Sequence, residues 1–386
     1  MLNHLPAFFK NKISRSIGIV FSLVGMSFGT WAAFIPFVKT KFGLDEAELG
    51  LLLLTLPLGI AFMNPLCIPF LRRYGSVLAT VISIMAVAAF LILPINMPSI
   101  WWLAGTLMLF GMAYSATNIA MNTCATQMEY HAGMNIMSTC HGMWSGGVMI
   151  GSALAGAAQG LGVKPEIYVI GVAVFVLWMG SWIRKPLSGL PDEQIGETTV
   201  KATKAFIRPN KALWLMIIVG ICIALAEGTM ADWAALYVKE VMDTPASVAS
   251  WGFSTYAFFM MSGRFLGDGL IGRYGGKNML RWAGILTTFG YLICVFAPYL
   301  FLVFIGLSMI GLGVSVGSPI LYAASSKVPG LPKGAGLAIF TTYAMIGFLG
   351  GPVLIGFIAK AFSLPLAFGV VAAMAATWVV ISRWFR

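Results

Sequence analysis

Charged residues are scarce in this sequence. Only 10% of its 386 residues are Asp, Glu, Lys or Arg, whereas 59% are hydrophobic and the mean hydropathy is +0.89. A soluble globular domain carries about 25% charged residues. The scarcity of charge therefore excludes an ordinary soluble domain and predicts a chain whose surface faces lipid.

Histidine and cysteine are also few. The three histidines (His4, His131 and His141) form no H-E-x-x-H pattern, and the five cysteines have no C-x-x-C spacing. A membrane enzyme needs clustered His, Asp or Cys side chains to hold a metal or to carry catalysis. We therefore expect no catalytic site, no metal and no cofactor, and we interpret the cysteines as small apolar packing residues.

Apolar runs long enough to cross a bilayer recur from end to end. A transmembrane helix needs about 18–20 predominantly apolar residues, and several prolines inside these runs predict kinks. The sequence therefore predicts an all-α integral membrane protein with twelve transmembrane helices. We expect them near residues 14–38, 47–71, 77–95, 99–123, 136–161, 165–184, 211–238, 247–271, 279–297, 299–324, 333–360 and 363–383.

The net charge of +11 is distributed unevenly along the chain. If the N-terminus is cytoplasmic, 18 of the 24 Lys and Arg residues fall on the cytoplasmic side and five on the outer side, with Arg264 inside a span. The positive-inside rule then predicts that both termini are cytoplasmic. The basic excess is explained by topology, so no nucleic-acid partner is expected. The first span follows Lys10, Lys12 and Arg15 and has no A-x-A-like site, so we expect no cleavable signal.

A polar segment divides the chain into two similar parts. We expect a six-helix bundle at residues 1–184, a cytoplasmic linker at 185–210 and a second six-helix bundle at 211–386. "RRYGS" (72–76) recurs as "GRYGG" (272–276), and two further pairs share an offset near 200, "WAAFIPFVK" (31–39) with "WAALYVK" (233–239) and "LFGMAYS" (109–115) with "MIGLGVS" (309–315). Pseudo-symmetric halves around a midplane site are typical of transporters.

Several stretches resemble a known family. "GRFLGDGLIGRYGGK" (263–277) resembles the loop motif of the major facilitator superfamily, and its first-half counterpart "NPLCIPFLRRYGS" (64–76) has Ile68 in place of the acid. "AEGTMADWAALY" (226–237) and "MNTCATQMEYHAGMNIMSTCHGMWSGG" (121–147) resemble the bacterial fucose-permease-like branch. Carriers of that branch have acids on spans 1 and 4, and this chain has none there, so proton coupling is not transferred to those positions.

The resemblance implies alternating access. Spans 1, 4, 7 and 10 would line a central cavity, and the loop motif would form a cytoplasmic gate. The gate residues that it implies are Arg73, Gly263, Arg264, Asp268, Arg273 and Gly275, with Glu129 as a weaker candidate. Arg264 and Asp268 are four residues apart, a spacing that permits an ion pair within one helix.

Three side chains inside spans are candidates for proton coupling. A charge at the bilayer centre costs at least about 2.5–3.5 kcal/mol, so acids there face an interior and are usually functional. Glu227 lies near the middle of the seventh span and is the leading candidate for proton coupling or substrate binding, followed by Asp232 and His141. The alternatives are a protonated structural Glu227, an Asp232 that serves an outer gate or caps a helix, and a hydrogen-bonded core His141.

Other polar and aromatic side chains are candidates for substrate binding. Asn118 and Asn122 share a face of the fourth span with Tyr114, and amides above an aromatic ring suit a neutral hydroxylated ligand. The alternative is hydrogen bonding between helices. The remaining candidates are Thr30, Trp31, Trp144, Trp233, Tyr256, Thr342 and Tyr343.

These observations favour a proton-coupled secondary transporter for a small polar organic solute, with a sugar-like compound preferred. Arg264 is the only Lys or Arg inside a span, which disfavours an anionic substrate. A proton-driven exporter of drug-like compounds, an uncoupled facilitator and a sensor stay open, whereas a channel lacks a filter or charged ring. We expect a monomer in the bacterial inner membrane whose partners are its substrate, protons and lipid.

Overall fold

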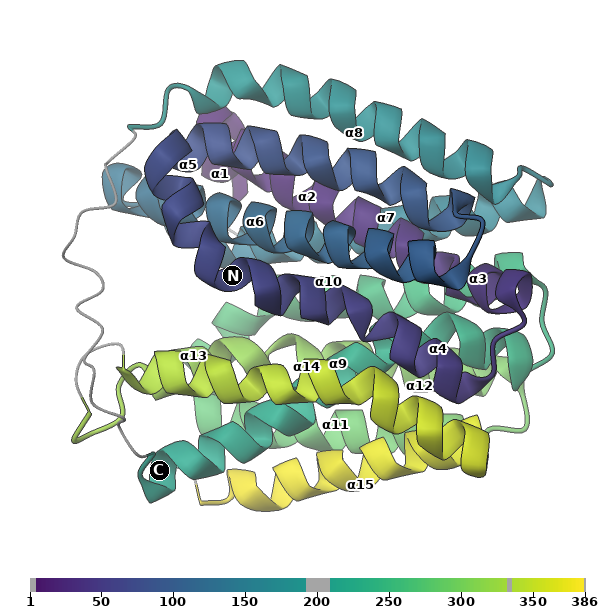
Figure 1. Cartoon of the computed structure of the whole chain (residues 1–386). Coiled ribbons are helices and arrows are strands. Elements are labelled where there is room, and N and C mark those ends of the chain that lie inside the picture. The colour runs from purple at the N-terminus through teal and green to yellow at the C-terminus, as the bar shows by residue number, and fades with distance from the viewer. Residues whose placement is uncertain (1–4, 192–208, 332–334, 385–386) are drawn as a thin grey trace. The chain divides into compact units, whose positions relative to one another are not determined.

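The protein is described by a computed structural model that covers residues 5–191, 209–331 and 335–384, without the side chain of Asp268. All regular elements in these ranges are helices (Figure 1). The chain groups into two compact units. Unit 1 comprises Met1–Gly43, Leu52–Lys201 and Pro245–Ser254, and unit 2 comprises Leu44–Leu51, Ala202–Thr244 and Thr255–Arg386.

Unit 1 is a helical bundle whose long helices pack in pairs, α5 against α6 and α8, and α2 against α7. Its helices are α1 (Leu5–Lys10), α2 (Lys12–Ala33), α3 (Ile35–Phe42), α5 (Thr55–Asn96), α6 (Ile100–Ala132), α7 (Met137–Gly160) and α8 (Pro165–Leu187).

Unit 2 is a second helical bundle, in which α9 packs beside α14 and α15 (Figure 1). Its helices are α4 (Glu46–Leu53), α9 (Lys211–Glu240), α10 (Ala246–Tyr274), α11 (Gly276–Phe296), α12 (Leu300–Ser315), α13 (Gly317–Ser325), α14 (Ala335–Ala361) and α15 (Leu364–Ser382). Two of these helices extend into unit 1: the first residues of α10, up to Ser254, and the last residues of α4, from Leu52 onward, belong to unit 1.

The predicted spans coincide with these helices. In the described ranges, nine helical stretches are long and apolar enough to cross a membrane. One of them, residues 46–96, contains two predicted spans, and α7 and α10 coincide with the fifth and eighth predicted spans without being among the nine. The all-α, multi-span membrane architecture predicted from the sequence is confirmed.

Three predicted spans are interrupted. The helical path breaks at Phe34, Leu54 and Val316, each of which is followed within three residues by a proline. A proline inside a helix removes the hydrogen bond to the carbonyl four residues earlier and crowds that turn. The prolines therefore explain why these spans form two helices each.

The duplicated Arg-Tyr-Gly sequence has the same local structure in both copies. The Arg73 guanidinium lies 5.4 Å from the Tyr74 ring centroid, and the Arg273 guanidinium lies 5.3 Å from that of Tyr274. The glycines that follow have positive φ, 72° and 79°, a conformation that a residue with a Cβ adopts at a cost. The repeat therefore encodes a matching turn into the third helix of each half.

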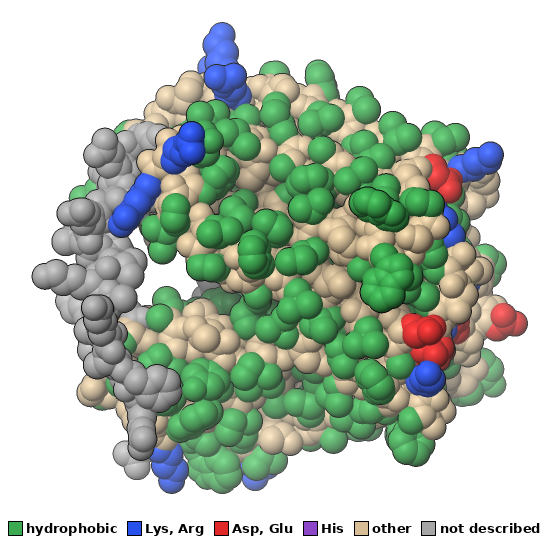
Figure 2. Space-filling model, in the orientation of Figure 1, with side chains coloured by type: hydrophobic (Ala, Val, Ile, Leu, Met, Phe, Trp, Pro, Cys, Tyr) green, Lys and Arg blue, Asp and Glu red, His purple; other side chains and the backbone are tan. Residues whose placement is uncertain are grey.

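The surface fits a bilayer environment. Figure 2 shows hydrophobic side chains over the middle of the helices and charged side chains toward their ends, on the face drawn. Exposed tryptophans such as Trp101, Trp178 and Trp282 add to this surface. Most of the predicted linker, residues 192–208, lies outside the described residues.

Candidate functional site

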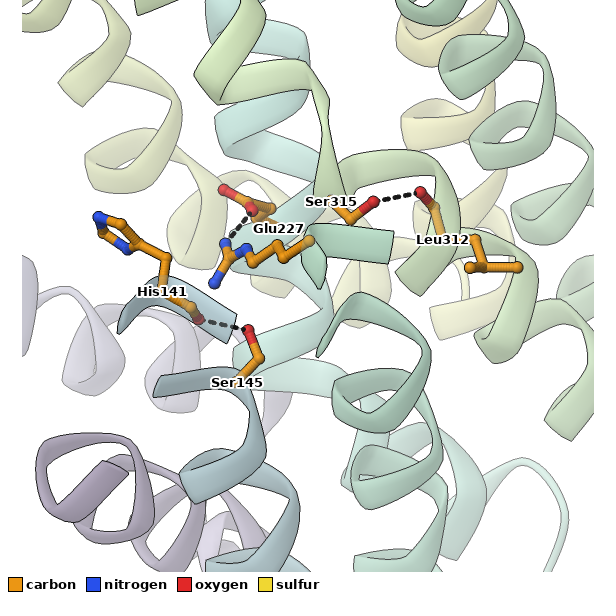
Figure 3. Close-up of polar contacts among 6 residues, drawn as sticks. His141, Ser145, Glu227, Leu312 and Ser315 are labelled. Atoms are coloured by element: carbon orange, nitrogen blue, oxygen red, sulfur yellow. Dashed lines mark hydrogen bonds and ion pairs between the residues drawn. The ribbon is translucent and has the colours of Figure 1, made fainter. Parts of the chain in front are cut away.

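Glu227 forms an ion pair inside unit 2. Its carboxylate Oε1 lies 3.3 Å from the Arg264 Nη2, and each side chain is only 13% exposed. Glu227, labelled in Figure 3, comes from α9, and Arg264 comes from α10, so the pair joins two helices through residues that are 37 positions apart in sequence. The sequence placed both residues inside spans, and it indicated that the spacing of Arg264 and Asp268 permits a second ion pair, within α10. The Asp268 side chain lies outside the described residues.

Buried tyrosines hold α9 in place beside this pair. The Tyr291 hydroxyl of α11 donates a 2.8 Å hydrogen bond to the carbonyl of Ala226, the residue before Glu227. One face of the Tyr237 ring stacks on Phe368 with centroids 4.3 Å apart, and its hydroxyl donates to the Cys294 carbonyl at 2.6 Å. Buried hydroxyls bonded in this way fix the rotation of α9 and therefore the direction in which Glu227 points.

Small residues seat α10 against α12. A Cβ on Gly263 would collide with the side chain of Ser315, and one on Gly311 would collide with the Tyr256 carbonyl. The Ser315 hydroxyl itself donates to the Leu312 carbonyl at 2.6 Å (Figure 3). This close approach of the helix backbones places Arg264 at the level where the tenth span breaks into α12 and α13.

Asp232 differs from Glu227 in its surroundings. It lies on α9, five residues after Glu227, and is partly buried. Of the described residues, none forms an ion pair or a hydrogen bond with its carboxyl group. Two other candidates of unit 2, Trp233 of α9 and Tyr256 of α10, are almost fully buried, with 0% and 2% of their surfaces exposed.

His141 lies where α7 packs against α2 in unit 1. Its ring makes an edge contact with Phe21 at 5.4 Å between centroids, and its backbone carbonyl accepts a hydrogen bond from Ser145 (Figure 3). A Cβ on Gly147 or Gly151 would collide with backbone carbonyls of α2. These glycines form a close-packed seam between α2 and α7, and His141 sits at one end of it.

Two aromatic candidates of unit 1 lie beside Phe28, a residue that the sequence analysis did not single out. The Phe28 ring centroid lies 5.8 Å from that of Tyr114 and 6.1 Å from that of Trp144. On the same helix as Tyr114, the Asn122 Nδ2 donates to the Asn118 Oδ1 at 3.0 Å. The structure therefore brings Tyr114 and Trp144 together through Phe28, and it pairs Asn118 with Asn122 along α6.

Further binding candidates belong to α2 in unit 1 and to α14 in unit 2. Thr30 and Trp31 are buried in α2. Thr342 is exposed on α14 and donates to the carbonyl of Ala338, while Tyr343 makes an edge contact with the Trp214 ring at 5.4 Å between centroids.

Among the predicted gate residues, Glu129 has a local partner. Its Oε1 accepts hydrogen bonds from the backbone N–H groups of Ile136 and Met137, at 2.7 and 2.8 Å. A carboxylate at this position satisfies N–H groups that the first turn of α7 leaves without helical partners. In this structure Glu129 therefore joins the end of α6 to the start of α7.

Comparison with known proteins identifies the family. The family profile described as Major Facilitator Superfamily matches residues 17–330 and 237–386. The chain belongs to this superfamily. An uncharacterized MFS-type transporter of Yersinia pestis is 30% identical over 375 residues, which cover 95% of this chain and 94% of that protein. The membrane protein MosC of Rhizobium meliloti is 26% identical over 371 residues, covering 94% and 89%.

Solved structures of the superfamily share the fold. The crystal structure of the nucleoside transporter NupG has a TM-score of 0.71 at 14% identity and covers 96% of this chain and 99% of that one. A bacterial homolog to the human lysosomal transporter Spinster, in an inward-facing and occupied conformation, gives 0.71 at 14%, with 96% of each chain covered. The chain is therefore a multi-pass membrane transporter of the major facilitator fold.

Proposed function

We propose that the protein is a proton-coupled secondary transporter of a small polar organic solute, with sugar-like compounds preferred. The observation that carries the proposal is the ion pair between Glu227 and Arg264, which lies inside a membrane-embedded unit and joins two helices. An ionisable pair at this depth is costly to bury and is retained where it serves transport.

The ion pair gives the proton a structural effect. Protonation removes the negative charge of Glu227, ends its attraction to Arg264 and so loosens the contact between α9 and α10. Loss of the proton on the opposite side of the membrane restores the pair. A proton that binds one conformation better than the other shifts the balance between them, which is what coupling requires.

Asp232 and His141 are secondary candidates for the coupling proton. Asp232 has no ion-pair partner among the described residues, so a charge on it would be uncompensated, and gain or loss of its proton would break no ion pair between helices of the described chain. His141 packs against an aromatic ring at the seam of unit 1, where it also fits a structural role.

Further elements of the proposal follow from the sequence. We place the chain in the fucose-permease-like branch and in the bacterial inner membrane, as a monomer with cytoplasmic termini. We also retain residues 1–184 and 211–386 as two six-helix bundles joined by the linker 185–210. The supports are the two quoted stretches, the distribution of Lys and Arg and the duplicated turn at Gly75 and Gly275.

Transport in proteoliposomes tests the proposal. The purified protein is offered sugars, amino sugars, nucleosides and lipophilic cations with and without an inward-acid or outward-acid pH gradient. We expect one neutral polar class to accumulate in response to a gradient, and Glu227→Gln to abolish the accumulation while leaving exchange across the membrane intact. Gradient-driven movement of lipophilic cations alone would favour a drug exporter, and equilibration that no gradient affects would favour a facilitator.

A further inference from the structure

We infer that unit 1 carries a binding surface for a neutral, hydroxylated ring compound of the pyranose-sugar type. It consists of Phe28 of α2, Tyr114, Asn118 and Asn122 of α6, and Trp144 of α7, and is called the ring–amide surface below. The inference rests on the proposed transport function and deepens it by assigning substrate contacts and substrate chemistry.

Three aromatic rings form one part of the ring–amide surface. Phe28 lies between Tyr114 and Trp144, tilted by 47° and 34° to them, and all three side chains are half-buried. Aromatic rings attract each other at centroid distances of about 4.5–7 Å. Carbon contacts need about 3.5–4.0 Å on each side, so no ligand ring fits between these rings, and a ligand lies against their outward faces.

Glycine packing explains why the rings converge. A Cβ on Gly25 would collide with the Trp144 carbonyl, and one on Gly29 would collide with that of Val148. The backbones of α2 and α7 therefore touch directly, and the side chains that flank this contact are forced to its edge. Phe28 and Trp144 meet at that edge beside Tyr114.

The two amides form the other part of the surface. Asn122 Nδ2 donates to the Asn118 backbone carbonyl at 2.7 Å and to the Asn118 Oδ1 at 3.0 Å. Of the side-chain atoms of the two amides, these bonds use the Asn122 Nδ2 as donor and the Asn118 Oδ1 as acceptor. Among the described residues, the Asn118 Nδ2 and the Asn122 Oδ1 have no partner. The 2.7 Å contact with the Asn118 backbone carbonyl requires a donor, which assigns that atom as the Asn122 Nδ2, and the 3.0 Å contact in turn assigns the Asn118 Oδ1, so one donor group and one acceptor of the pair are left for a ligand.

We expect the amides to face away from lipid. Tyr114, Asn118 and Asn122 are four residues apart and share one face of α6. Polar side chains inside a span face a bundle interior or a water-filled cavity because hydrocarbon offers them no hydrogen bonds. The surface therefore lies where a transported solute can reach it.

The charges of the three helices determine which ligands fit. Within α2 and α6, the charged residues are Lys12, Arg15 and Glu129, all near helix ends, and α7 contains no Asp, Glu, Lys or Arg. His141, the one titratable ring of α7, lies three residues before Trp144, and its ring contacts Phe21. Because no Asp, Glu, Lys or Arg of these helices lies at the surface, an ionic ligand would be left without a carboxylate, ammonium or guanidinium counter-charge, and a neutral one is favoured.

A pyranose ring matches both parts of the surface. A hydroxyl group both donates and accepts, so two adjacent hydroxyls of the ligand can bind the unused donor and the unused acceptor of the two amides. The C–H face of the ring covers the aromatic side chains, as apolar surface does in most small-molecule sites.

Equilibrium binding to the purified full-length protein tests the inference. Isothermal titration uses neutral hexoses and their monodeoxy derivatives, glucosamine against N-acetylglucosamine, a nucleoside with and without its ribose hydroxyls, and a lipophilic cation. We expect a neutral hexose to bind, Asn118→Ala to weaken it about tenfold and Phe28→Ala about two- to tenfold. One monodeoxy sugar loses affinity for the wild type but not for Asn118→Ala, a pattern that a merely structural asparagine does not produce.

Matched controls separate binding from folding. Asn96→Ala and Phe175→Ala remove the same side chains from exposed positions of unit 1 and leave the affinity unchanged. If Phe28→Ala does not fold, Phe28→Tyr and Asn118→Ala carry the test. Unchanged affinity in Asn118→Ala and in the Phe28 variants overturns the inference. So does binding confined to charged compounds, or to a nucleoside regardless of its hydroxyls, or the absence of binding by every hexose.

The assay needs no proton gradient, so its outcome is independent of proton coupling. Hexose binding without gradient-driven transport would uphold the ring–amide surface and refute coupling. Gradient-driven transport of another class, unaffected by Phe28→Ala and Asn118→Ala, would uphold coupling and refute the surface.

Discussion

Glu227 and Arg264 each compensate a charge that would otherwise stand alone inside unit 2. Both side chains are 13% exposed, and their charged atoms are 3.3 Å apart. Replacing one partner of a buried pair leaves the other charge uncompensated and costs about 3–5 kcal/mol, whereas replacing both is often close to neutral. This asymmetry distinguishes a real pair from two independent residues.

The first prediction is a double-mutant cycle on this pair. Glu227→Gln and Arg264→Gln each lower the free energy of unfolding by up to about 3–5 kcal/mol. The loss is smaller if the charge that remains is able to reach water. The double variant loses less than the sum of the two, with a coupling of about 0.5–3 kcal/mol. Thermal and denaturant unfolding in one detergent measure all four proteins.

Asp243→Asn provides the control for this cycle, since Asp243 is an acid of the loop after α9 and not a partner of Arg264. If the effects of the Glu227 and Arg264 variants were strictly additive, the ion pair would contribute nothing to stability. The observation on which the proposed function rests would then be lost.

At the residue scale, sequence reasoning found the unusual residues but not their partners. Glu227 stands out because an acid inside an apolar span is costly to place in the membrane and is usually functional. Its pairing with Arg264 depends on how α9 and α10 are rotated about their axes, which is set by contacts such as Tyr291 on Ala226. Phe28 was missed because a phenylalanine in an apolar span carries no signal of its own.

The contact between α2 and α7 is sensitive to added volume. A Cβ on Gly147 would collide with the Ser22 carbonyl, whereas one on Gly171 of α8 would have no atom within 4 Å. Gly147→Ala therefore forces the two backbones apart and lowers the free energy of unfolding by about 1–3 kcal/mol. The matched Gly171→Ala is neutral or stabilising by up to about 1 kcal/mol.

Thermal unfolding of these two alanine variants beside the wild type checks this prediction. Equal melting temperatures for both would mean that the glycines of the seam are interchangeable with larger residues, contrary to the packing described.

The contact between α4 and α14 combines close packing with an exposed ion pair. The Lys360 Nζ lies 2.7 Å from the Asp45 Oδ2, and Asp45 also accepts a 2.9 Å hydrogen bond from the Glu48 N–H. The hydrogen bond from Lys360 holds the pKa of Asp45 below its ordinary value of 3.8. Gly356 lies against the backbone of Glu46, so the helices approach closely beside the pair.

We expect Asp45→Asn to lower the melting temperature slightly at low salt. Because the pKa of Asp45 is lower in the folded protein, the stabilisation is complete above pH 3.8, constant between pH 5 and 8, and lost as the pH falls through the folded value. Salt screens an exposed pair, so the difference from wild type shrinks at high ionic strength. A difference that persists at high salt or at low pH would assign it to helix capping and not to the ion pair.

At the scale of elements, the sequence predicted the spans well because length and apolarity are local properties. It expected kinks at prolines inside the spans, and the structure has complete breaks at Leu54 and Val316, which precede Pro57 and Pro319. It did not predict that Leu44–Leu51 groups with unit 2 and Pro245–Ser254 with unit 1. That grouping arises from contacts between helices far apart in the chain, which no local pattern records.

For the whole molecule, the two units share a duplicated turn but carry different functional side chains. The two copies of the Arg-Tyr-Gly turn, at residues 73–75 and 273–275, have matching cation–π distances and matching glycine conformations. The chemistry, in contrast, differs between the units. Unit 2 holds the Glu227–Arg264 ion pair and unit 1 holds the uncharged ring–amide surface. We therefore assign proton coupling to the second unit and solute binding to the first.

The most direct test of this account is proton flux evoked by the transported solute. Purified protein is reconstituted into liposomes that contain a pH-sensitive dye, and the solute identified by binding is added outside. The account predicts proton movement with the wild type and with Asp232→Asn, and none with Glu227→Gln, although Glu227→Gln still binds and exchanges the solute. Proton flux that persists in Glu227→Gln would contradict the assignment of the coupling proton to Glu227.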